Sequence, residues 1–277
     1  MNSDISVSAK GQIKKGVKRG VYLLPSLFTI GNLLSGFYAI VAVYNDEYTK
    51  ASIAILVALV LDGLDGAVAR LMGSQSDFGI ELDSLADLVS FGVAPAILAY
   101  VWAIKPYSRI AWLFSSIIPT ALFVSCGAFR LARFNLQARK LDKRYFVGLP
   151  TPAAAAVIAS FALLMSESPF AVLIKQESSF RQATSALVVV ALYLLSFLMV
   201  SKLRYRSLKG IEIKKRQPFT ILIGLTLFLL IIASYPSIAL FAISFAYMAS
   251  GLLRPIVRRR AGPELMEEIA VEKHQAS

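Results

Sequence analysis

Long stretches without any charged residue dominate this sequence and restrict what it can fold into. Residues 21–44 and the 37 residues of 217–253 contain no Asp, Glu, Lys or Arg. About 20 mostly apolar residues in a helix span the hydrocarbon core of a bilayer. The 277-residue chain is 57% hydrophobic and 17% charged, against about 45–50% and about 25% in soluble domains. These figures exclude a disordered chain and an ordinary soluble globule, and they predict a polytopic membrane protein.

The apolar runs predict an all-α fold of eight transmembrane helices. The run 217–253 is too long for one span, and Ser-Tyr-Pro-Ser at 234–237 splits it into a hairpin, because proline disfavours helix in the residue before it. We expect a transmembrane domain over 21–254, between a basic segment 1–20 and a tail 255–277. The other six spans are predicted at 21–44, 51–71, 88–104 (with a start as early as residue 80), 110–129, 145–166 and 182–201.

Basic residues predict the orientation of these spans. With eight spans, 24 of the 29 Lys and Arg residues fall on one side of the membrane, together with both termini. Lys and Arg accumulate on the cytoplasmic side of membrane proteins, so both termini are expected in the cytoplasm. The net charge of +12 is therefore mostly a signature of orientation, and the sequence contains no recognition module of a nucleic-acid-binding protein.

Four aspartates interrupt or begin apolar helices. Asp62 and Asp65 are three residues apart and Asp83 and Asp87 are four apart, so each pair shares one helix face. Asp62 and Asp87 are each expected about 12 Å from the cytoplasmic end of their helix. Carboxylates inside a membrane are unfavourable and mark function by default. Two antiparallel helices would aim all four into a polar cavity that faces the cytoplasm.

These carboxylates predict a site for hard divalent cations. Four carboxylates in one cavity repel each other, and the chain has only one histidine and one cysteine. Oxygen ligands alone favour Mg²⁺ or Mn²⁺, and two such ions can clamp a diphosphate. Gly66 and Ala69 lie on the face of Asp62, where they leave room either for a ligand or for close helix packing.

The same region resembles a known enzyme family. Residues 62–87, DGLDGAVARLMGSQSDFGIELDSLAD, match all eight specified positions of D-x2-D-G-x2-A-R-x8-G-x3-D-x3-D. This is the signature of the CDP-alcohol phosphotransferase family. Residues 23–37, 81–95, 126–135 and 145–155 also resemble the integral-membrane phosphatidylserine synthases within it.

The resemblance implies a reaction and its setting. The phosphatidyl group of CDP-diacylglycerol would be transferred to the hydroxyl of L-serine, giving phosphatidylserine and CMP. The activity would be that of a CDP-diacylglycerol–serine O-phosphatidyltransferase in the bacterial cytoplasmic membrane. The family also suggests a homodimer.

The resemblance further implies roles for individual residues. Asp62, Asp65 and Asp83 would hold two Mg²⁺ or Mn²⁺ ions, with Asp87 contributing at the second ion and acting as general base. The CMP part of CDP-diacylglycerol would be lined by Gly66, Ala69, Arg70 and Gly79.

Five further polar residues are candidates for substrate contact. Thr29 and Asn32 lie about one turn apart in a largely apolar helix, where they would touch CDP-diacylglycerol or form an interhelical hydrogen bond. Arg130, Arg133 and Asn135 lie near the cytoplasmic end of the fourth span. Guanidinium groups pair with carboxylates in a fork, so these residues are expected to bind serine or a phosphate; the alternative is that the arginines only orient the helix.

Two other functions are compatible with parts of the pattern. A sibling enzyme that uses glycerol phosphate, inositol phosphate or choline would share the same metal site. A cation transporter would use the carboxylates as an ion pathway, but the acids lie near one membrane face only and no matching second repeat is present.

Overall fold

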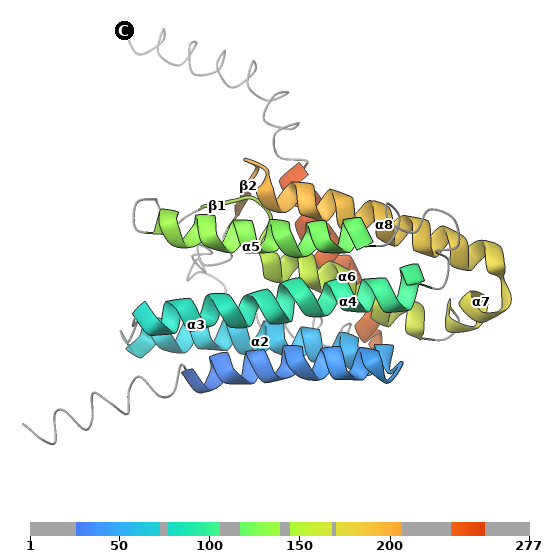
Figure 1. The fold of residues 1–277 in the computed structure, drawn as a ribbon, viewed down its shortest axis with the longest axis horizontal. Helices are drawn as coiled ribbons and strands as arrows, with labels where there is room; N and C mark the ends of the chain where they lie inside the picture. Colours follow the sequence, from blue (N-terminus) through green and yellow to red (C-terminus); the bar gives the residue numbers. More distant parts are fainter. Residues whose placement is uncertain are drawn as a thin grey trace, which may run out of the picture.

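The computed structural model describes residues 26–72, 77–105, 117–138, 145–167, 170–206 and 234–252. Within these residues the chain is helical except for one short two-stranded ladder (Figure 1). The predicted segments 1–20 and 255–277 lie outside the described residues. The elements are helix Ser26–Tyr44, α2 (Tyr48–Met72), α3 (Asp77–Asp87), η1 (Leu88–Val93), α4 (Ala94–Ala99), η2 (Tyr100–Ile104), α5 (Ile118–Ala138), β1 (Tyr145–Val147), α6 (Thr151–Ser166), α7 (Phe170–Gln176), α8 (Ser178–Val200), β2 (Arg204–Arg206) and helix Pro236–Leu252.

Four of the described helices are long and apolar enough to cross a membrane. The helices Thr151–Ser166 and Pro236–Leu252 are apolar but shorter. These four candidate spans confirm the expected helical membrane fold in part. Residues 110–116 and 217–233, which belong to other predicted spans, lie outside the described residues. The four spans are Ser26–Tyr44, Tyr48–Val68, Phe78–Ile104 and Ser178–Val200.

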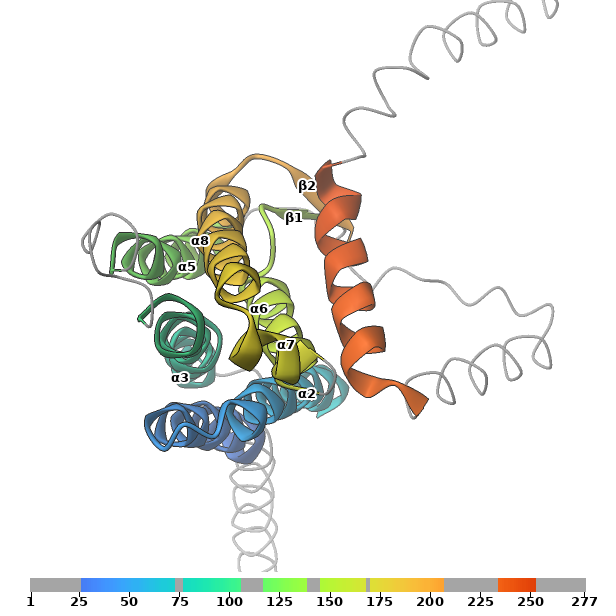
Figure 2. The same cartoon turned by 90° about the vertical axis from the view of Figure 1, so that its right-hand side faces the viewer.

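The helices run alongside one another, so that their polar ends meet at one end of the bundle. The beginning of helix Ser26–Tyr44, the end of α2, the beginning of α3 and the end of α5 lie at the same end (Figure 1). Seen along the bundle, helix Pro236–Leu252 lies at one edge and is inclined to the others (Figure 2). Large apolar side chains such as Leu34, Phe37 and Val60, each 60% exposed, cover the outside, as expected for a surface in contact with lipid.

Small side chains bring the helices close together. One buried cluster contains Ala51, Ala54 and Ala58 of α2 and packs them against Ala155 and Ala159 of α6. Association of helices within a membrane depends on such close van der Waals contact. The alanine-rich stretches therefore position α2, and with it the aspartates near its end.

The third span is one continuous helical path with two π-helical segments. Its first part, α3, ends at Asp87, and η1 begins at the next residue. π-helical turns are rare and often occur at functional sites. The π-helical turn after Asp87 therefore changes which of the following residues lie on the same face of the helix as Asp83 and Asp87.

The predicted span 145–166 is wrong at its beginning, because its first residues form a strand. Tyr145–Val147 pairs antiparallel with Arg204–Arg206, and α6 begins only at Thr151. Tyr, Phe and Val favour strands, and Pro150 fits the residue before a helix. Gly148 separates strand from helix with a φ of 83°. The all-α prediction therefore omitted this ladder.

The ladder is anchored to the last described helix by Tyr205. The Tyr205 side chain is fully buried and its hydroxyl donates a hydrogen bond to the carbonyl oxygen of Met248 at 3.4 Å. A Cβ atom at Gly251 would collide with the Tyr205 ring. Burial raises the pKa of Tyr205 to about 12, so this hydroxyl keeps its proton at physiological pH.

The fourth predicted span continues further than expected. Helix α5 extends to Ala138, whereas the predicted span ended at residue 129. Arg130, Arg133 and Asn135, which were expected near the end of this span, therefore lie within the helix. The three residues lie within two turns of the helix, and each has a different hydrogen-bond partner.

Replacing Gly148 with alanine should destabilise the protein. A left-handed conformation costs a residue with a side chain about 1–2 kcal/mol, and the new Cβ would meet the carbonyl oxygen of Met199. We expect the apparent melting temperature in detergent to fall by about 2–8 °C. Gly63→Ala is the matched control, because a Cβ there meets nothing within 4 Å; equal melting temperatures for the two variants would contradict the argument.

Candidate functional site

Three carboxylates from two helices converge at the polar end of the bundle. One oxygen each of Asp62, Asp83 and Asp87 lies within 4.8 Å of the others. Asp62 comes from α2, whereas Asp83 and Asp87 lie one turn apart on α3. Asp87 is buried, with 8% of its surface exposed, and the other two are half-buried. The expected convergence of the two acidic helices is therefore present for these three residues.

This cluster fits a divalent cation by its donor set. Its three groups offer only carboxylate oxygens, the ligands that Mg²⁺ and Mn²⁺ prefer. Repulsion between three negative charges in a partly buried site opposes their approach unless positive charge compensates for it. The buried Arg130 interacts electrostatically with Asp87, which offsets one charge and leaves the cluster negative.

Asp65 is held apart from the other three carboxylates. It lies on α2, is 7% exposed, and its Oδ2 accepts a hydrogen bond from the Thr29 hydroxyl. It is not a member of the three-carboxylate group. The predicted quartet thus consists of a cluster of three and a fourth carboxylate that the first helix holds.

The first helix contacts the acidic helices through a second polar residue. The Asn32 side chain is fully buried, and its Nδ2 donates a hydrogen bond to Asp87 Oδ1 at 3.1 Å. Of the two alternatives that the sequence left open for Thr29 and Asn32, interhelical hydrogen bonding is present. Asn32 Oδ1 is buried and has no hydrogen-bond partner among the described residues.

The remaining residues of the signature lie on the same two helices. Gly66 of α2 and Gly79 of α3 are half-buried. Ala69 and Arg70 belong to the last part of α2, and their side chains lie outside the described part of the structure. The order of these residues along α2 and α3 places Gly66 and Gly79 on the two helices that carry the carboxylate cluster.

The three candidate residues of α5 have different surroundings. Arg130 is 6% exposed and donates a hydrogen bond from Nη1 to Thr151 Oγ1 at 3.2 Å. Arg133 donates from Nη1 to the carbonyl oxygen of Val200, near the end of α8, at 3.1 Å. Asn135 donates from Nδ2 to Ser84 Oγ at 2.9 Å. The charge of Arg130 also interacts with Asp87, whereas the hydrogen bonds of Arg133 and Asn135 link α5 to α8 and α3.

Sequence reasoning missed three hydroxyl residues around the site. Ser84 contacts Asn135, Thr151 contacts Arg130, and Ser90 donates to the carbonyl oxygen of Asn32 at 2.9 Å. Ser90 lies three residues after Asp87, a spacing that places it near the acidic face and could have singled it out. Nothing in the sequence distinguishes Ser84 and Thr151 from the other hydroxyl residues of the spans.

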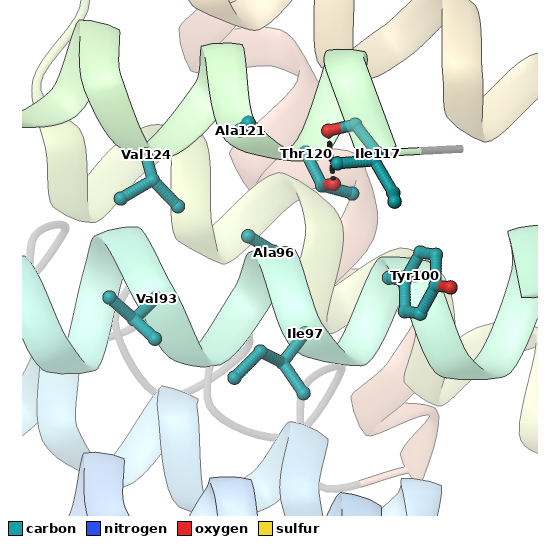
Figure 3. A pocket seen from close by; sticks show the side chains of 8 residues that line it. All are labelled: Val93, Ala96, Ile97, Tyr100, Ile117, Thr120, Ala121 and Val124. Carbon is teal, nitrogen blue, oxygen red and sulfur yellow. Dashed lines mark hydrogen bonds between the residues drawn. The ribbon is translucent and has the colours of Figure 1, made fainter. Parts of the chain in front are cut away.

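A separate groove in the bundle is apolar. It has a volume of about 350 Å³ and lies between residues 93–100 and residues 117–124 (Figure 3). The Thr120 hydroxyl on its wall donates to the carbonyl oxygen of Ile117 at 2.8 Å. None of the described residues that line this groove is charged, so they do not provide the groups that the acidic site brings together.

Comparison with known proteins places this site in a family. A sequence model of the CDP-alcohol phosphatidyltransferase family matches residues 22–194, which include the three converging carboxylates and Arg130. The chain belongs to the CDP-alcohol phosphatidyltransferase family. The expected family is thereby confirmed.

Relatives in this family carry closely related names. The chain is 36% identical over 234 residues to a CDP-diacylglycerol–serine O-phosphatidyltransferase of Helicobacter pylori, covering 84% of this chain and 91% of the relative. A Bacillus subtilis protein with the same name is 34% identical over 67% of this chain and 91% of its own length. An archaetidylserine synthase of Methanothermobacter thermautotrophicus is 34% identical over 68% of this chain and 71% of its own length.

Each carboxylate of the cluster should contribute to cation binding in this family member. We expect Asp62→Asn, Asp83→Asn and Asp87→Asn each to weaken Mn²⁺ binding by at least about tenfold, because each removes one charged oxygen ligand. Titration of the purified protein with Mn²⁺, followed by electron paramagnetic resonance, measures this. Glu81→Gln is the matched control on α3, because Glu81 is exposed and lies outside the cluster; weakening by Glu81→Gln as well would indicate a nonspecific charge effect.

Proposed function

We propose that this protein transfers the phosphatidyl group of CDP-diacylglycerol to the hydroxyl of L-serine, forming phosphatidylserine and CMP. The observation that carries the proposal is the convergence of Asp62, Asp83 and Asp87 in a chain 36% identical over 234 residues to a relative with this activity in its name. The same three carboxylates would serve any alcohol acceptor. The choice of serine rests on the names of the relatives.

The carboxylates would hold two divalent ions, Mg²⁺ or Mn²⁺. Asp62, Asp65 and Asp83 would hold the two ions, with Asp87 contributing at the second. When bound, the ions would neutralise the oxygens of the diphosphate and stabilise the leaving phosphate. The hydrogen bond from Thr29 to Asp65 would fix the orientation of that carboxylate.

Asp87 would be the general base for the serine hydroxyl. The serine oxygen forms a bond to the phosphorus that carries diacylglycerol, and the bond from this phosphorus to the bridging diphosphate oxygen breaks. Asp87 accepts the hydroxyl proton, and CMP leaves with the bridging oxygen. A base must lie within hydrogen-bond reach of the proton or one water away. The position of Asp87 beside Asp62 and Asp83, which would hold the ions at the diphosphate, supports this role.

CDP-diacylglycerol would bind along α2 and α3. Gly66, Ala69, Arg70 and Gly79 would line the CMP part, since small residues let the nucleotide approach the helix. Thr29 and Asn32 would border the same site. The unpartnered Asn32 Oδ1 offers an acceptor there to a donor group of the substrate.

Arg130 would bind the serine carboxylate or a substrate phosphate. A guanidinium has five N–H donors, and the hydrogen bond from Arg130 to Thr151 uses Nη1. Its Nε has no partner among the described residues, and its charge interacts with Asp87. Arg133 and Asn135 would complete this pocket from the next turns of α5.

The proposed enzyme would work in the cytoplasmic membrane of a bacterium as a homodimer. Eight spans would form the catalytic domain over 21–254, with the polar cavity and both termini in the cytoplasm. Support comes from four candidate spans and from 24 of 29 basic residues on one predicted side. The segments 1–20 and 255–277 would be cytoplasmic extensions.

The reaction can be measured directly with purified protein. We expect CDP-diacylglycerol, labelled serine and Mn²⁺ or Mg²⁺ to yield CMP and a labelled serine phospholipid, with the activity lost in excess chelator. Asp87→Asn should lower kcat by at least about 100-fold, because base catalysis contributes on that order. Product with glycerol phosphate, inositol phosphate or choline but not with serine would assign a sibling activity.

Replacing Arg130 should separate serine binding from lipid binding. Arg130→Lys keeps the charge but loses the forked geometry, so we expect the KM for serine to rise about tenfold while the KM for CDP-diacylglycerol stays similar. Steady-state kinetics with each substrate varied in turn measures both values. Lys202→Ala, which removes an exposed positive charge, is the control; an increase only in the KM for CDP-diacylglycerol would assign Arg130 to a lipid phosphate instead.

A further inference from the structure

The first helix and the third span meet at one point without any room for a side chain. A Cβ atom at Gly36 would lie 2.7 Å from the Cα and 2.8 Å from the Cβ of Ser90. A backbone atom cannot rotate away as the end of a flexible side chain can. Any larger residue at position 36 therefore has to move helix Ser26–Tyr44 relative to η1.

The same contact leads to the acidic site through two hydrogen bonds. Ser90 is fully buried, and its hydroxyl donates to the carbonyl oxygen of Asn32 at 2.9 Å. That carbonyl also faces the N–H of Gly36, four residues later in the helix. The Asn32 side chain then donates to Asp87 Oδ1 at 3.1 Å. Gly36, Ser90 and Asn32 thus form one continuous path to Asp87.

The path begins where the helix geometry changes. Ser90 lies in η1, the π-helical segment that starts directly after Asp87. Because π-helical hydrogen bonds run from residue i to i+5, residue 90 has a different position relative to Asp87 than it would have in a regular α-helix. The contact with the first helix holds Ser90 in this position.

We propose that Gly36 and Ser90 are positioning residues that, acting through Asn32, hold the Asp87 carboxylate at the metal and proton-transfer site. The role in proton transfer rests on the proposed function, whereas the role in cation binding rests on the convergence of Asp62, Asp83 and Asp87 alone. Neither Gly36 nor Ser90 contacts the substrate in this proposal. Their effect is on the place and orientation of a group that does.

The first test uses glycine substitutions along one helix. We expect Gly36→Ala to weaken Mn²⁺ binding by about tenfold and to lower kcat by about 10–100-fold, because displacements near 1 Å change rates on that scale. At saturating Mn²⁺ the KM for CDP-diacylglycerol should stay within about twofold. Gly31→Ala is the matched control, because Gly31 precedes Asn32 directly and its Cβ would make only an ordinary 3.4 Å contact with the Leu61 side chain.

The second test removes only the hydroxyl. We expect Ser90→Ala to weaken Mn²⁺ binding and lower kcat by about fivefold, the effect of one hydrogen bond. In an Asn32→Ala background the same substitution should change Mn²⁺ affinity by less than about twofold, because the side chain that Ser90 positions is gone. A purely structural role of Ser90 would instead give independent effects that multiply.

The two proposals can fail separately. Wild-type Mn²⁺ affinity and kcat in both Gly36→Ala and Ser90→Ala would overturn the positioning role, as would multiplicative effects of Ser90→Ala and Asn32→Ala. Circular dichroism in detergent shows whether Gly36→Ala folds. If it does not fold, the positioning role is tested by Ser90→Ala alone and in the Asn32→Ala background. If the wild-type protein makes no serine phospholipid, the proposed function fails, and the Mn²⁺ titrations still decide whether Gly36 and Ser90 position Asp87.

Discussion

The repulsion among carboxylates placed inside apolar helices is the constraint on which the rest of this structure depends. Asp62, Asp83 and Asp87 approach within 4.8 Å of one another, an arrangement that is unfavourable without compensating positive charge. Arg130 offsets part of this charge. The uncompensated negative charge suits the site to divalent cations, which prefer carboxylate oxygens. The fold must therefore supply enough contact elsewhere to hold the three groups together.

Two features of the bundle provide that contact. Alanine-rich faces bring α2 against α6, while the first helix meets η1 at Gly36 and Ser90. The first helix is more than a membrane span, because Thr29 and Asn32 each hydrogen-bond to a different aspartate. Packing and polar positioning thus come from the same segment, which links the stability of the bundle to the geometry of its site.

The distribution of basic residues separates orientation from recognition. The proposed orientation, with most Lys and Arg residues on the cytoplasmic side, would explain most of the +12 charge. Arg130 differs, because it is almost completely buried and interacts with Asp87. Arg133, only three residues later, donates to the end of α8. Arginines one turn apart on a helix therefore have different surroundings, and burial distinguishes them.

The sequence by itself determined the membrane class, the family and the residues of the acidic site, because long uncharged runs and aspartates at fixed spacing on two helices depend only on local order along the chain. It did not determine the strand at Tyr145–Val147, since a short strand forms through pairing with a distant partner. It also did not determine where α5 ends. Only the tertiary structure decided that Asp65 pairs with Thr29 and that Ser90 meets Gly36. Asp65 and Thr29 are separated by 36 positions in the sequence, and Ser90 and Gly36 by 54. The geometry of both contacts therefore depends on how the helices pack.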